Sequence, residues 1–94
     1  MLDDEDVMIF EQMKYQLIVW LRVEAVRQGL DIADKTPLQL VDLLHSQEGF
    51  DETRLQVVTT LLHLADSVSA KGQALLIDYK QAMMFYLMHT RRAR

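Results

Sequence analysis

The sequence contains no cysteine, one proline and three glycines among its 94 residues. Without cysteine the chain has no disulfides, no thiol nucleophile and no cysteine metal cluster. No apolar run approaches the ~20 residues of a membrane-spanning helix, so no membrane partner is expected. A secretory signal begins with positive charge, whereas this chain begins with the acidic segment Asp3–Asp6. We therefore expect a cytoplasmic protein.

Basic residues are also scarce, since 10 Lys and Arg face 14 Asp and Glu, for a formal net charge of −4. Binding to a nucleic-acid backbone needs lysine and arginine in excess, so a nucleic-acid partner is unlikely on charge alone. A chain of this length forms one domain, and it is long enough to bury a core without staples. We treat residues 1–94 as a single helical domain.

The proline and the three glycines lie where helices would start or stop, and no stretch alternates as a strand does. The pattern predicts an all-α fold, a small antiparallel bundle of about four helices. The expected ranges are 4–28, 37–47, 52–68 and 73–91.

Short capping signals support these boundaries. Thr36-Pro37-Leu38-Gln39 reads as a capping box with proline at the first helical position. Asp51 is suited to the N-cap of the third helix, and Gly29 to the residue after the first. The segment 67–72 leaves two possibilities open, because the third and fourth helices could be separate or form one bent helix.

The third helix has one apolar side. At about 100° per residue, its apolar side chains gather on one arc and its polar ones on the other. The apolar arc consists of Leu55, Val58, Leu61, Leu62, Ala65 and Val68.

The first and fourth helices each carry two apolar stripes. The first stripes are Ile9, Phe10, Met13, Leu17, Trp20 and Leu21 on one helix, and Leu75, Leu76, Tyr79, Met83, Tyr86 and Leu87 on the other. The second stripes lie on different sides and form the expected interface: Met8, Tyr15, Val19, Val23, Val26, Ile77, Met84, Phe85 and Met88.

Three interpretations explain the second stripes. Helices 1 and 4 could be central in the monomer and flanked by the other two. Alternatively, the second stripes join across a two-fold interface, which makes the protein a homodimer. The third interpretation is that the second stripes bind a different protein. Methionine-rich surfaces suit such binding because the methionine side chain repacks easily. We favour the homodimer.

Candidate chemical groups are few. His45, His63 and His89 lie on three different helices, and pairs such as His63 with Asp66 fit an ordinary helical ion pair. The serines lie at helix ends or on a polar face, where capping explains them. We therefore expect no catalytic residue, no metal ligand and no cofactor, and a small dimeric helical enzyme is the third-ranked function.

A transcriptional regulator with direct DNA contact is the second-ranked function. Helices 37–47 and 52–68 could mimic a helix-turn-helix, whose second helix needs basic and amide side chains near its start. Here that start carries two carboxylates, Asp51 and Glu52, before Arg54.

Charge at the two ends gives one further expectation. An up-down-up-down bundle would place Asp3–Asp6 beside Arg91, Arg92 and Arg94. The first-ranked function is a non-enzymatic protein–protein interaction module: a small acidic regulator, adaptor or chaperone-like protein that binds partners through apolar helix faces.

Overall fold

A computed structural model of the chain describes the backbone of residues 2–92 and the side chains of residues 5–90. Four α-helices account for most of it: α1 (Leu2–Arg27), α2 (Pro37–His45), α3 (Glu52–Lys71) and α4 (Leu76–Arg92). Residues 2–92 contain no strand, so the predicted all-α class with four helices is confirmed. Within this part of the chain, no helix combines the length and the apolarity that crossing a membrane requires.

The predicted caps of α2 and α3 are present. The Gln39 N–H donates to Thr36 Oγ1 over 3.2 Å, and the Thr36 N–H donates to Gln39 Oε1 over 2.8 Å, which completes the capping box. Asp51 caps α3 by accepting the Arg54 N–H at 3.0 Å. These side chains satisfy donors that the helix itself leaves unpaired, and so they fix where each helix begins.

Replacing Thr36 with alanine is expected to loosen α2 selectively. The substitution removes the acceptor for the Gln39 N–H, at a cost of roughly 0.5–2 kcal/mol. A helix of 9 residues does not persist without docking, so the loss should appear as faster amide exchange across residues 37–46. Thr53→Ala, at an exposed position that caps nothing, is the matched control. Unchanged exchange in α2 of the Thr36 variant would contradict the role given to this cap.

Helices α3 and α4 are separate. Gly72 ends α3 with φ 78°, a left-handed conformation that favours glycine, and its N–H donates to Val68 O at 2.9 Å. Helix α4 starts three residues later than expected, because the Asp78 carboxylate accepts the Leu75 N–H at 2.8 Å and caps the helix there. Lys71 Nζ lies 2.9 Å from the same carboxylate, so the joint is held by charge as well.

The arrangement is built on α3. Helix α3 packs against α1, α2 and α4, whereas the backbones of α1 and α4 do not come into contact. The interpretation that helices 1 and 4 are central in the monomer is therefore wrong. The main core joins α1, α2 and α3, and α4 adds only partly buried side chains to it. Its buried members are Leu17, Leu21, Ala25, Leu40, Leu44, Leu55, Val57, Val58, Leu61 and Leu62.

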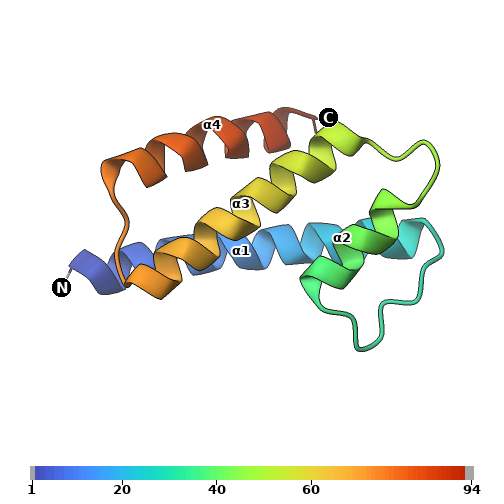
Figure 1. Cartoon of the computed structure of the whole chain (residues 1–94), viewed down its shortest axis with the longest axis horizontal. Coiled ribbons are helices and arrows are strands. Elements are labelled where there is room, and N and C mark those ends of the chain that lie inside the picture. Colours follow the sequence, from blue (N-terminus) through green and yellow to red (C-terminus); the bar gives the residue numbers. More distant parts are fainter. Residues whose placement is uncertain (1, 93–94) are drawn as a thin grey trace.

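Helix directions also differ from an up-down-up-down bundle. Figure 1 shows α1 and α4 running the same way, with α3 crossing in the opposite sense. Asp6, near the start of α1, bonds to the Ala74 N–H and to Tyr79 at the start of α4. The expected pairing of the start of helix 1 with the end of helix 4 is wrong. Helix α2 is too short to span the molecule, so the chain direction alternates among the three long helices α1, α3 and α4. The side chains of Asp3 and of Arg91, Arg92 and Arg94 lie outside the described residues.

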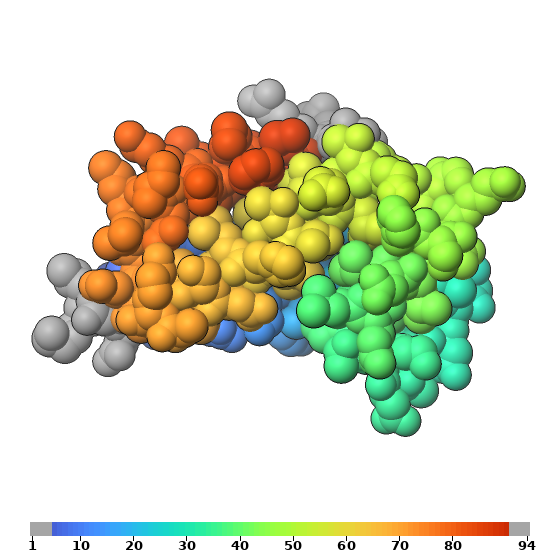
Figure 2. Space-filling view, in the orientation of Figure 1, coloured from blue at the N-terminus to red at the C-terminus, as the bar shows by residue number. Residues whose placement is uncertain are grey.

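The molecule is thin. Its principal extents are 43 × 28 × 17 Å, and the shortest leaves room for two layers of helix. Figure 2 shows α2, α3 and α4 side by side on one face, with α1 visible only beneath them. Each long helix therefore has one side packed in the core and another facing solvent.

Candidate interaction surface

The predicted interface residues are exposed, with one exception. Phe85 packs against the main core and is half-buried, because it points from α4 toward α3. The other eight are among the exposed large hydrophobic side chains of the described residues: Met8, Tyr15, Val19, Val23, Val26, Ile77, Met84 and Met88.

On α1 the predicted second stripe forms one continuous line, which we call the α1 stripe: Met8, Tyr15, Val19, Val23 and Val26. At about 100° per residue, these side chains project from the side of α1 opposite to Phe10, Leu17 and Leu21. Since those three are buried against α3 and its surroundings, the α1 stripe faces away from α3. Nothing in residues 2–92 covers it.

On α4 the first stripe is not buried as the sequence suggested. Leu76, Met83 and Leu87 are 72%, 62% and 47% exposed, and we call them the α4 stripe. They project away from α3, on the same side of the molecule as the α1 stripe. The cause is the position of α4, whose backbone approaches only that of α3. Among the described side chains of α4, Asp78 and His89 are buried.

The remaining exposed side chains of α4 form a second surface. Ile77, Met84 and Met88, which we call the outer patch, lie on the flank of α4 directed away from α1. The structure therefore does not bring all nine predicted residues together. It joins the α1 stripe to the α4 stripe and leaves the outer patch separate.

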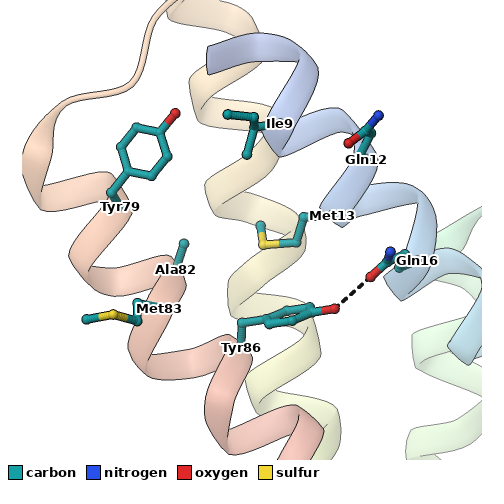
Figure 3. A pocket seen from close by; sticks show the side chains of 8 residues that line it. All are labelled: Ile9, Gln12, Met13, Gln16, Tyr79, Ala82, Met83 and Tyr86. Atoms are coloured by element: carbon teal, nitrogen blue, oxygen red, sulfur yellow. Dashed lines mark hydrogen bonds between the residues drawn. The ribbon is translucent and has the colours of Figure 1, made fainter. Parts of the chain in front are cut away.

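An open apolar groove of about 350 Å³ runs between α1 and α4, with α3 behind it (Figure 3). Met13 and Ala82 lie deep in it, and Ile9 and Met83 lie along its edges. Ile9, Met13 and Met83 belong to the stripes expected to be the main apolar faces of their helices, and Ala82 belongs to neither stripe of its helix, so the sequence did not indicate the groove.

Two tyrosines bridge the groove. The Tyr86 hydroxyl donates to Gln16 Oε1 at 2.6 Å, and the Tyr79 hydroxyl donates to Asp6 Oδ1 at 2.6 Å. The hydrogen bond to Asp6, reinforced by burial, raises the pKa of Tyr79 to about 12. The Tyr79 phenol therefore stays protonated near neutral pH. The two tyrosine hydroxyls are donors that hold α4 beside α1.

A cluster of aromatic and basic side chains closes the far end of the α1–α4 gap. The Arg54 guanidinium lies 4.6 Å from the centre of the Trp20 ring, and Arg54 Nε donates to His89 Nδ1 at 3.4 Å. Burial, together with the charge of Arg54, lowers the pKa of His89 below its usual value. The buried, neutral imidazole packs edge-on against the Trp20 ring, with 5.3 Å between the ring centroids.

The three histidines lie in different surroundings. Among the side chains that the structure describes, no group of three or more His, Asp or Glu is placed to hold a metal ion. His63 is exposed on α3, and His45 Nδ1 lies 2.8 Å from Glu52 Oε1. Near the start of α3, Leu55, Val57 and Val58 are buried among the other helices.

Comparisons with protein-family models, with curated proteins and with solved structures found no match to this chain. The exposed apolar surface of α1 and α4 is therefore the main guide to what this chain does.

Proposed function

We propose that this chain is a non-enzymatic protein–protein interaction module, a cytoplasmic regulator, adaptor or chaperone-like protein. Its binding surface consists of the α1 stripe and the α4 stripe, with the groove between them, and its first partner is a second copy of itself. The observation that carries the proposal is the number of uncovered apolar side chains on two helices. Six large hydrophobic side chains of α1 and six of α4 are at least 39% exposed.

The total exposed surface supports the same proposal. A folded monomer of 11.0 kDa typically exposes about 5600 Å², whereas this chain exposes 6258 Å². A thin molecule exposes more surface than a round one of the same mass, and much of what α1 and α4 expose is apolar. Soluble monomers rarely leave large continuous apolar patches uncovered, and those that occur mark interaction sites.

The test is capture of proteins from the native cell by the tagged chain, with bound proteins read by mass spectrometry. We expect Val19→Glu with Val23→Glu to abolish capture, because two carboxylates in the α1 stripe would be buried at the interface. The matched control, Gln56→Glu with His63→Glu, adds two carboxylates on exposed positions of α3 and should capture normally. Circular dichroism confirms that each variant is folded.

Neutralising Arg91, Arg92 and Arg94 separates this function from DNA binding. We expect the arginine variant to capture the same proteins as the parent. If that variant loses function while the stripe variant remains active, the ranking reverses in favour of a DNA-binding regulator. Salt-dependent retardation of DNA by the parent chain would point the same way.

A further inference from the structure

The charges that flank the α1 stripe are divided along the helix. Glu5 and Glu11 lie in its first half, whereas Arg22 and Arg27 lie in its last two turns, and all four are exposed. At 1.5 Å per residue, Glu5 and Arg27 are about 33 Å apart. One end of this face is therefore acidic and the other is basic.

The four charges also occupy matching sides of the stripe. Helical periodicity places Glu5 and Arg27 on the edge nearest to α4, and Glu11 and Arg22 on the opposite edge. Each edge therefore carries one acidic and one basic residue, at nearly equal distances from the middle of the helix near Gln16 and Leu17.

We propose that a second copy of this chain docks face to face on the α1 stripe, with the two α1 helices antiparallel about a two-fold axis near residues 16 and 17. The proposal rests on the self-association proposed above and adds its geometry. In this register Glu5 meets Arg27 of the second copy on one edge, and Glu11 meets its Arg22 on the other. A parallel arrangement would instead oppose like charges at all four positions, which is destabilising.

The apolar positions fit the same register. Residues equally far from the centre of the stripe face each other, so Met8 packs against Val26 of the second copy and Tyr15 against its Val19. The apolar residues 8, 15, 19, 23 and 26 are separated by steps of seven, four, four and three, so they keep to one side of the helix, with Gln12 between Met8 and Tyr15. The same two-fold axis lays the α4 stripes of the two copies beside this seam and covers both grooves.

Existing contacts of the four charges are solvent-exposed and exchangeable. Glu11 accepts a hydrogen bond from the Ser69 hydroxyl of α3, and this exposed bond exchanges for a contact with Arg22 of the second copy. Arg27 Nη1 lies 3.2 Å from Glu24 Oε2, but the Arg27 side chain is 70% exposed, so the bond exchanges readily for one to a second copy. No hydrogen bond or ion pair of Glu5 competes within the described residues, and the exposed Arg22 is likewise open to a partner.

Charge reversal tests the register in the full chain. Sedimentation equilibrium should show that Glu5→Lys and Arg27→Glu each weaken the dimer about tenfold, because each change opposes like charges at two places. The two variants mixed together should form a heterodimer of parental affinity. The chain that carries both changes should form a homodimer of parental affinity. If the singles associate as strongly as the parent, or the mixture fails to recover, the antiparallel register is overturned.

Cross-linking gives a readout that is independent of affinity, since the chain contains no native cysteine. Met8→Cys and Val26→Cys change side chains that are 56% and 57% exposed, so both variants should fold normally. With a short bismaleimide reagent, we expect a covalent dimer when the two variants are mixed and little with either alone. Cross-linking of Met8→Cys to itself would establish a parallel dimer instead and overturn the proposal.

The outcomes distinguish this inference from the proposed function. A dimer that forms but gives no cross-link at either position uses another surface, such as the outer patch, and overturns only the arrangement. A chain of 11.0 kDa that stays monomeric at tens of micromolar removes self-association altogether. In that case the capture experiment still decides whether the stripes bind a different protein.

Discussion

Replacing Leu62 with alanine should destabilise the protein by about 2–5 kcal/mol. Leu62 is 3% exposed and lies in the main core, where α3 packs against α1 and α2. The substitution removes three buried carbon atoms and leaves a cavity, which the thin two-layer molecule can close only in part. Since small domains are stable by about 5–15 kcal/mol in total, the urea midpoint should fall by a large fraction.

His63→Ala is the matched control for this result. His63 follows Leu62 directly but is exposed, so its replacement should cost less than about 0.5 kcal/mol. Comparing the two variants tests which side of α3 faces the core, because Leu62 and His63 are neighbours on the helix. Equal shifts of the urea midpoint in the two variants would mean that α3 is rotated from the orientation described above.

Replacing Phe10 with alanine should cost about 3–5 kcal/mol and should free α4 first. Phe10 is 1% exposed, and its ring meets the Tyr79 ring edge-on with 5.1 Å between centroids. It joins Ala65 and Val68 in a small second core at the junction of α1, α3 and α4. Because α4 contributes no fully buried apolar side chain, this junction is one of its main attachments to the rest of the molecule.

Amide exchange measures the effect helix by helix. In the Phe10 variant, we expect protection across residues 76–92 to fall more than protection in α3. Ile9→Ala, beside it but 46% exposed, is the control and should leave the exchange of α4 nearly unchanged. A double-mutant cycle with Tyr79→Leu should give a coupling of about 0.5–1.5 kcal/mol for the ring pair. A coupling energy near zero would mean that the contact between the two rings does not explain the loss of protection in α4.

The all-α class and the starts of α2 and α3 could be predicted because they depend on local chemistry. The capping box at Thr36 and the N-cap at Asp51 act within one turn, and the structure contains both. The apolar arc of α3 was also predicted correctly, with Leu61 and Ala65 fully buried. Val57 was missed because α3 packs against three helices, so its buried side is wider than the one arc that periodicity indicates.

The relative positions of the helices could not be predicted in the same way. Periodicity shows that α1 and α4 are apolar on two sides, but it does not show which side meets α3. Met83 and Leu87 therefore looked like core residues, although they are exposed, and Phe85 looked like an interface residue, although it packs inward. Tyr79 and Tyr86 held a usable signal, since a partly buried phenol needs a hydrogen-bond partner, and these two find Asp6 and Gln16 on α1.

The separation of the α1 and α4 stripes from the core has a consequence for how this protein tolerates sequence change. Val19, Val23 and Met83 are about half exposed, so polar replacements should cost little folding stability compared with replacements in the core. A library of variants sorted only for folding would therefore accept substitutions at these positions. A library sorted for binding would reject them, and the positions that differ between the two selections would outline the interface on the surface of the molecule.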